Sequence, residues 1–137
     1  PYGEVSEEKM WENYEWFISQ VMPVAEEAGV RMGLHPDDPP LQKLGNVSRI
    51  MVSGNNIKKA IYDIVPSDIL GVTMCQATFH MMGENVEQVI RDLADKIYFV
   101  HFRNAVGNKY KFRETFHDNG ISLYSNSTQP AIATSTP

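Results

Sequence analysis

The stretch Val30-Arg31-Met32-Gly33-Leu34-His35-Pro36-Asp37-Asp38-Pro39-Pro40 predicts a short buried strand that ends on a histidine. The prolines that follow the histidine restrict the backbone and disfavour helix. Two later stretches repeat this plan: a strand over residues 70–76 that carries Cys75, and a strand over residues 97–102 that carries His101. Each strand therefore places, at its carboxyl end, a side chain that can bind a metal ion.

Helical patterns precede each of the three strands. We predict one helix over residues 4–28, capped by Ser6 and Gly29, a second beginning at Asn55 or Asn56, and a third beginning at Asn85. Alternating helices and strands are typical of a parallel sheet covered by helices. The apolar residues that recur at spacings of three and four on these helices are Met10, Tyr14, Phe17, Val21 and Val24, then Ile57, Ala60, Ile61 and Ile64, then Val86, Val89, Ile90, Leu93 and Ala94.

Four segments lack such patterns. We expect residues 41–54 to form a loop with a short helical turn, residues 79–83 a loop, and residues 109–117 a loop with a short helix. Residues 121–137 contain no charged residue and are rich in Ser, Thr, Pro and Ala, which predicts a disordered tail. The expected organisation is one α/β domain over residues 1–120 and the tail 121–137.

Composition narrows the class of protein. The 137 residues fit one domain, and a formal net charge of −5 without a Lys/Arg cluster argues against nucleic-acid binding. We find no apolar run long enough to cross a bilayer and no signal-peptide pattern, so we expect no membrane association. The single cysteine, Cys75, excludes an internal disulfide and favours a reducing, cytoplasmic location. Because the chain begins at Pro1 without Met, we expect a processed chain or a fragment.

Both doubly wound sheets and (β/α)₈ barrels form their sites at the carboxyl ends of parallel strands. Phosphate-binding glycine motifs are missing after all three strands, which disfavours a nucleotide-binding sheet. A full barrel needs about 250 residues. We therefore expect a partial (β/α)₈ (TIM) barrel of about three βα units from its carboxyl-terminal half.

His35, Cys75 and His101 could bind one divalent metal ion. Imidazole and thiolate ligands suit zinc, iron or manganese-type ions with an open coordination position. Taken singly, a buried cysteine is usually a small core hydrophobe, and a histidine at a strand end is usually a hydrogen-bonded structural residue. Because all three residues lie at the carboxyl end of a strand, we weigh a joint metal site equally with the separate structural roles.

Arg103 lies on the same side of its strand as His101. It could bind a substrate carboxylate or stabilise developing negative charge, or it could form an ion pair with Asp37, Asp38 or Glu114, which spacing alone favours. The two aspartates could orient the ring of His35, or be solvated loop residues.

Two further histidines have weaker assignments. His117 could be an acid/base group near the site, although His80 and His117 also fit surface histidines. We take Arg103 and His117 as candidate substrate-binding residues and leave the catalytic residues unassigned.

The order and spacing of four motifs resemble the metal-dependent, barrel-type mannonate dehydratases of the xylose-isomerase-like superfamily, over about residues 4–120. The motifs are Gly33–Pro40 (GLHPDDPP), Gly71–Cys75 (GVTMC), Tyr98–Arg103 (YFVHFR) and Phe116–Gly120 (FHDNG).

This resemblance implies a (β/α)₈ barrel enzyme that removes water from the sugar acid D-mannonate to give 2-keto-3-deoxy-D-gluconate in hexuronate (glucuronate) catabolism. It implies Mn²⁺ or Fe²⁺ held by two His, one Cys and one Asp, of which His35, Cys75 and His101 match the first three. A bound ion would stabilise the enolate-like charge as a Lewis acid, with Arg103 as a partner for that charge.

The sequence departs from the family pattern in two places. Residues 121–124 (ISLY) stand where the family has an Asp-x-Asp-Met segment that supplies the fourth ligand, and Asp118 lies in a different register. The amino-terminal barrel strands are not in the chain. We therefore expect a fragment of the enzyme with a non-family tail over residues 121–137 and doubtful activity of its own.

Two other functions remain open. The first is a non-catalytic partial barrel that associates with another chain or forms a homo-oligomer, because open sheet edges invite association. The second is another metal-dependent sugar isomerase or epimerase on the same barrel. Such sites usually favour Glu and Asp ligands, so Cys75 speaks against that function.

Overall fold

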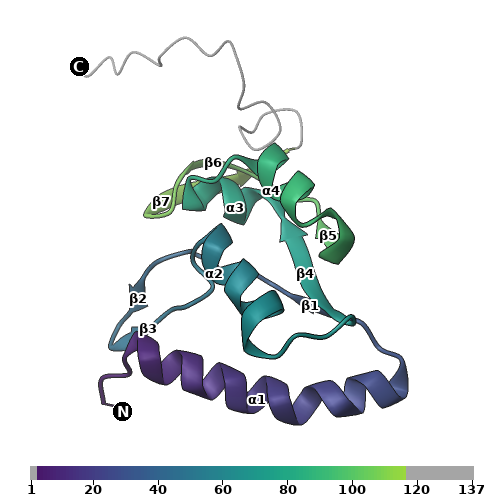
Figure 1. Cartoon of the computed structure of the whole chain (residues 1–137). Helices are drawn as coiled ribbons and strands as arrows, with labels where there is room; N and C mark the ends of the chain where they lie inside the picture. Colours follow the sequence, from purple (N-terminus) through teal and green to yellow (C-terminus); the bar gives the residue numbers. More distant parts are fainter. Residues whose placement is uncertain (1–2, 117–137) are drawn as a thin grey trace, which may run out of the picture.

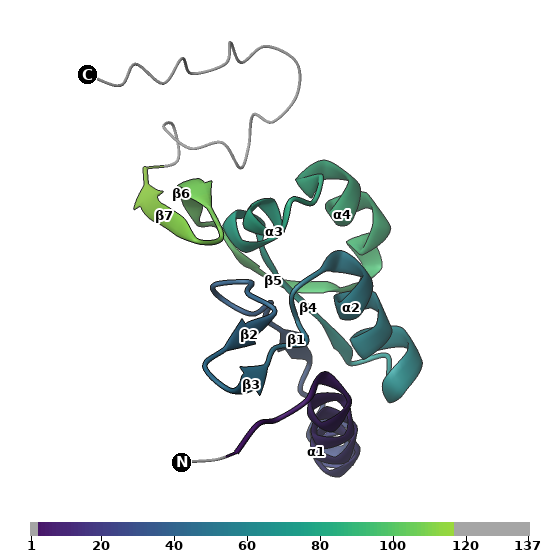
Figure 2. The same cartoon turned by 90° about the vertical axis from the view of Figure 1, so that its left-hand side faces the viewer.

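The fold is built on a parallel sheet of three strands, described in a computed structural model that covers residues 3–116 of the chain. The strands are β1 (Met32–Leu34), β4 (Leu70–Cys75) and β5 (Ile97–His101), in the spatial order β1-β4-β5. Along the chain, helices connect each of these strands to the next, as Figures 1 and 2 show. The expected α/β class and parallel sheet are confirmed.

The central strand fixes the register of its neighbours. All six residues of β4 are buried, and Cys75 pairs with His101 of β5. A Cβ atom added to Gly71 would lie 2.2 Å from the carbonyl oxygen of Lys96 and 2.7 Å from the ring of Tyr98. Only glycine allows β4 this close approach to the chain that enters β5.

The first helix, α1 (Glu7–Ala28), runs beneath the sheet in the view of Figure 1. Its predicted caps are confirmed: the side chain of Ser6 accepts from the amide of Lys9, and Gly29 adopts φ 65°. The predicted apolar face is wrong in part, since Phe17 and Val24 are exposed at 51% and 65%. The residues that α1 buries instead are Ile18, Met22 and Ala25. Spacing could not choose between these two apolar faces, because only packing against the core distinguishes them.

The second helical segment consists of α2 (Gly54–Lys58) and a π-helical continuation (Lys59–Ile64). The predicted cap at Asn55 or Asn56 is wrong, because the side chain of Ser53 caps the helix by accepting from the amide of Asn56. The apolar face itself is as expected. Its fully buried members are Ile57, Ala60 and Ile61.

Residues 79–83, expected as a loop, belong mostly to helix α3 (Gln76–Met82), which ends at Gly83 with φ 88°. Local sequence gives little sign of this helix, since its N-cap residue makes no side-chain hydrogen bond. Burial of Phe79 at 0% exposure holds the segment against the core. The next helix, α4 (Val86–Asp92), has the predicted Asn85 cap and is followed by a 3₁₀ turn (Ala94–Lys96).

Two β-hairpins form in segments that were expected to be loops with short helical turns. Residues 41–54 contain β2 (Lys43–Leu44) and β3 (Val47–Ser48), not a helical turn. The second hairpin, β6 (Asn104–Asn108) and β7 (Lys111–Thr115), replaces the loop and short helix expected at 109–117. Both short hairpins gain stability from contacts with the rest of the fold, which a local pattern does not encode.

The core lies between the sheet and the helices. Its largest fully buried side chains include Phe79, Ile57, Ile61, Leu70 and Leu93. The third strand differs from expectation, because β5 is not covered on both sides: Phe99 and Val100 are exposed at 62% and 52%. Within residues 3–116, no helix combines the length and apolar character needed to cross a membrane.

Candidate metal centre

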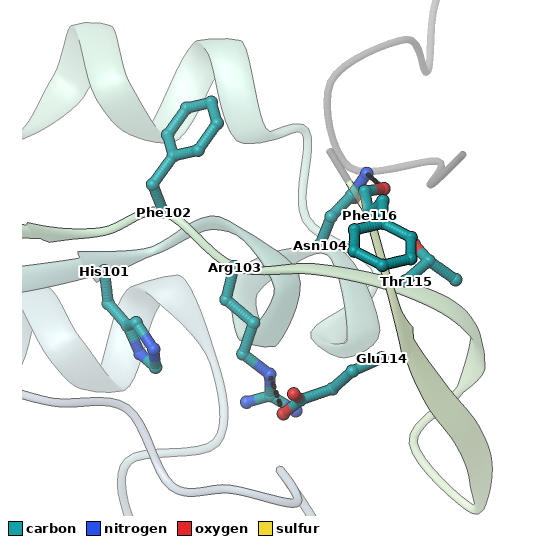
Figure 3. A pocket seen from close by; sticks show the side chains of 7 residues that line it. All are labelled: His101, Phe102, Arg103, Asn104, Glu114, Thr115 and Phe116. Carbon is teal, nitrogen blue, oxygen red and sulfur yellow. Dashed lines mark hydrogen bonds and ion pairs between the residues drawn. The ribbon is translucent and has the colours of Figure 1, made fainter. Parts of the chain in front are cut away.

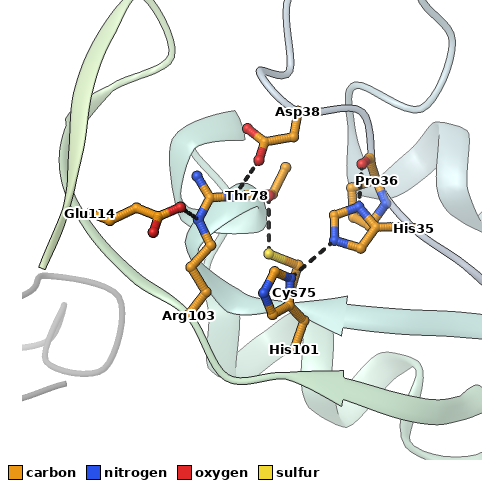
Figure 4. A network of polar contacts seen from close by, with 8 residues as sticks. All are labelled: His35, Pro36, Asp38, Cys75, Thr78, His101, Arg103 and Glu114. Carbon is orange, nitrogen blue, oxygen red and sulfur yellow. Dashed lines mark hydrogen bonds and ion pairs between the residues drawn. The ribbon is translucent and has the colours of Figure 1, made fainter. Parts of the chain in front are cut away.

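The three predicted ligand residues meet at the carboxyl ends of the three parallel strands. His35 directly follows β1, Cys75 ends β4 and His101 ends β5. One ligand atom from each residue lies within 4.8 Å of the others. Figure 4 shows the two imidazole rings and the sulfur facing one another. The fold thus brings together residues that are 26 to 66 positions apart, because adjacent parallel strands end at one edge of a sheet.

The ring of His35 is oriented by a backbone carbonyl. Its Nδ1 lies 2.6 Å from the carbonyl oxygen of Pro36, which can only accept, so Nδ1 carries the proton. Nε2 is then the bare nitrogen, and it lies 3.4 Å from Nδ1 of His101. Two nitrogens bound to one ion at about 2.1 Å in tetrahedral geometry are about 3.4 Å apart. The histidine pair therefore fits one metal ion.

Cys75 supplies the buried donor of the cluster. Its side chain has 0% exposure, and the hydroxyl of Thr78 donates to its sulfur at 3.1 Å. This hydrogen bond orients the sulfur, whose thiolate form is the one that binds metal ions. Thr78 was not predicted from the sequence. Its position three residues after the cysteine became a contact only because α3 starts at the end of β4.

Arg103 lies beside this cluster and pairs with two carboxylates. Its guanidinium donates to Asp38 and lies 3.0 Å, through Nε, from a carboxylate oxygen of Glu114. Its side chain is only 9% exposed. Burial opposes the charge, but the hydrogen bond and charge of Asp38 outweigh it and raise the pKa of Arg103 above its ordinary value. Of the interpretations considered from the sequence, the ion pair with Asp38 and Glu114 is present.

Asp37 and Asp38 do not orient the ring of His35, which the Pro36 carbonyl does. Asp37 instead accepts from Arg49 at 2.5 and 2.8 Å and from the amide of Met51 at 2.9 Å. These bonds fasten the loop after β1 to residues 49–51. Asp38 is an exposed loop residue, as one of the alternatives expected, but it is ion-paired with Arg103.

A cavity of about 430 Å³ opens next to the cluster. Its wall includes His101, Arg103, Glu114 and Thr115 of strand β7, and Phe116, which directly follows that strand, as Figure 3 shows. The cavity thus places a candidate metal ligand beside the Arg103–Glu114 ion pair.

The remaining candidate residues lie elsewhere. His80 is half-buried on α3, where burial lowers its pKa, and it is not part of the cluster. His117, Asp118 and residues 121–137 lie outside the described residues.

Comparison with known proteins identifies the family of this chain. The family model described as D-mannonate dehydratase (UxuA) matches residues 1–125. A mannonate dehydratase of Endomicrobium trichonymphae is 37% identical over 118 residues, covering 85% of this chain and 32% of that protein. One from Streptococcus pneumoniae is 37% identical over 116 residues, covering 82% and 31%.

A solved structure is similar as well. The crystal structure of mannonate dehydratase from Streptococcus suis serotype 2 superposes with a TM-score of 0.74 at 34% identity, covering 82% of this chain and 33% of that one. The chain thus spans about a third of the length of the relatives it matches. A family match over most of the chain, with a similar fold, establishes descent: this chain belongs to the D-mannonate dehydratase (UxuA) family.

Proposed function

We propose that this chain is the metal-binding part of a (β/α)₈-barrel hydro-lyase that dehydrates D-mannonate to 2-keto-3-deoxy-D-gluconate in hexuronate catabolism. The observation that carries the proposal is the convergence of His35, Cys75 and His101 at one edge of a parallel sheet. Family membership supplies the substrate class and reaction. Three consecutive parallel strands in sequence order are what one arc of a barrel requires.

His35, Cys75 and His101 would hold the metal, which we propose is Mn²⁺ or Fe²⁺. Two imidazoles and a thiolate suit Fe²⁺ better than Mg²⁺ or Ca²⁺, which prefer oxygen ligands, while Mn²⁺ is proposed from the family resemblance. Three protein donors leave coordination positions open, as a catalytic site needs. When bound, the ion would supply positive charge that polarises a substrate oxygen.

The reaction breaks the C–H bond next to the carboxylate and the C–O bond of the 3-hydroxyl, releases one water, and leaves an enol that becomes the keto acid. Arg103 lines the cavity beside His101, and its Nε edge lies 3.0 Å from the exposed carboxylate of Glu114. We propose that this edge contacts the substrate carboxylate. We propose a substrate-binding role for His117 from the sequence resemblance alone.

The enzyme would work in the cytoplasm. The buried free thiol of Cys75 supports a reducing compartment, since metal binding requires the reduced form.

A second function, association through an open sheet edge, is favoured by the apolar surface around β5. Phe99 and Phe102 are exposed at 62% and 63%, and β5 pairs with β4 alone among the described strands. We propose that this edge binds another chain or a second copy. Light scattering during size-exclusion chromatography tests this: a monomer at every concentration would rule out the second copy.

The direct test of the catalytic proposal supplies D-mannonate to the metal-loaded chain and follows the keto acid by NMR. Conversion by the parent chain and its loss in Cys75→Ser would support the activity. If the parent binds metal, Cys75→Ser does not, and neither converts D-mannonate, the chain would be a metal-binding part that needs the rest of a barrel for activity. Absence of metal from the parent would overturn the metal centre.

A further inference from the structure

A pair of charged residues connects the segments that carry His35 and His101. Asp38 follows the first histidine by three positions, Arg103 follows the second by two, and the guanidinium donates to the carboxylate. We propose that the Asp38–Arg103 ion pair positions the two histidines at metal-binding separation before an ion arrives. This inference rests on the metal centre proposed above.

The sheet alone does not join these two segments. β1 and β5 lie on either side of β4, and each is hydrogen-bonded to β4 rather than to the other. His101 pairs with Cys75, whereas the pairing of β1 with β4 ends at Leu34, one residue before His35. Backbone pairing therefore leaves the separation of the two rings to contacts beyond the strand ends. The Asp38–Arg103 pair spans this gap alongside the 3.4 Å contact of the rings, as Figure 4 shows.

The carboxylate end of the pair is held rigidly. The adjacent Asp37 is fixed to Arg49 and to the amide of Met51. Pro36 and Pro39 restrict the backbone on both sides of the two aspartates. Asp38 and His35 consequently move as one unit.

The guanidinium end is held as well. The side chain of Arg103 is 9% exposed and lies 5.6 Å from the ring centroid of Phe112. Its backbone amide donates to the carbonyl of His101 at 2.9 Å, which couples the two residues. A shift of Asp38 relative to Arg103 would therefore change the distance between the rings.

Glu114 provides a matched control. It contacts the same guanidinium at 3.0 Å, but its side chain is 71% exposed and it lies on the β6–β7 hairpin, which carries none of the three ligands. Loss of its charge changes the surroundings of Arg103 without releasing either histidine. A positioning role thus predicts different effects for the two carboxylates.

The experiment compares the parent chain with Asp38→Asn, Arg103→Met, the double variant and Glu114→Gln. In metal-free protein, NOEs between the ring protons of His35 and His101 report whether the rings stay together. In the same samples, titration with Co²⁺ gives the metal affinity from its absorption spectrum. Neither readout needs substrate, so a substrate-contact role of Arg103 does not affect them.

We expect Asp38→Asn and Arg103→Met to lose the NOEs and to bind Co²⁺ at least about 10-fold more weakly. Removing a group that supports metal ligands typically has this effect on metal affinity. The double variant should be no weaker than the worse single variant, because both remove one interaction. Glu114→Gln should keep the NOEs and lose less than about 5-fold, as exposed ion pairs do.

Native NOEs and parental Co²⁺ affinity in Asp38→Asn would overturn the inference and leave the metal centre standing. A parent chain that shows the NOEs but binds no Co²⁺ would instead overturn the metal centre, and with it any role of the ion pair in metal binding. If circular dichroism shows that Asp38→Asn unfolds, Arg103→Lys decides. A folded Arg103→Lys chain that binds Co²⁺ more weakly would support the positioning role, and unchanged affinity would refute it.

Discussion

Nε2 of His35 lies 3.4 Å from Nδ1 of His101, although the two residues are 66 positions apart and their strands, β1 and β5, do not pair with each other. The contact is compatible with two states. Without metal, one ring can donate a hydrogen bond to the other. In the proposed metal-bound state, both nitrogens would be bare and would hold the ion together with the sulfur of Cys75. We therefore expect stability to depend on metal.

A bound ion should stabilise the native chain. At a free metal concentration of 100 times Kd, binding to the native state adds about 2.7 kcal/mol to the free energy of unfolding. Cys75→Ser removes the thiolate donor and should abolish most of this gain. Urea denaturation with and without Mn²⁺ measures it, and an equal gain in both proteins would place the ion elsewhere. Lys9→Gln, on an exposed ion pair, serves as a control that should keep the full gain.

Gly71→Ala should destabilise the fold. The added Cβ would lie 2.2 Å from the carbonyl oxygen of Lys96, a backbone atom that cannot move without disturbing the β4–β5 pairing. Overpacking of this kind costs about 1–3 kcal/mol. Thermal unfolding measures the loss. Gly3→Ala, with no atom within 4 Å of the new Cβ, should unfold like the parent, and equal behaviour of both variants would contradict the close approach.

Asp37→Ala should unfasten the loop that carries His35. It removes the oxygen that accepts from two nitrogens of Arg49 and the oxygen that accepts from the Met51 amide, in a pair whose side chains are each 20% exposed. Leaving these donors without a partner costs about 1–3 kcal/mol. Urea denaturation should show the loss. The control Glu12→Ala breaks an exposed pair with Lys9 and should cost less than about 1 kcal/mol.

Tyr14 should make stability depend on alkaline pH. Its hydroxyl donates to the carbonyl of Ala60 at 3.1 Å, and burial raises its pKa to about 12 from 10.0. A raised pKa means that the native state favours the neutral phenol, so this contribution is complete below pH 10 and is lost as pH rises from 10 through 12.

In Tyr14→Phe, the part of the alkaline loss that Tyr14 causes should disappear. Unfolding free energies measured between pH 9 and about 12 test this. Tyr110→Phe, at a site 78% exposed, should keep the parental pH dependence. An unchanged pH profile in Tyr14→Phe would show that its hydroxyl is not buried.

The sequence by itself determined the three parallel strands, the helices α1, α2 and α4 that precede them, and the end of each strand to within one residue. His35, Cys75 and His101 could be identified because strands, caps and prolines are local signals. Parallel strands then place their carboxyl ends together by a general rule. The same locality explains the correct caps at Ser6, Gly29 and Asn85.

Only the tertiary structure decided which groups complete the site. The face that α1 buries depends on packing against the core, which is why Ile18 is buried while Phe17 is not. Thr78 reached Cys75 because α3 begins at the end of β4, although no local signal marks that helix. The choice of Asp38 and Glu114 as partners of Arg103 depends on distances between segments far apart in sequence, and such distances are set when the whole chain packs, not by local spacing.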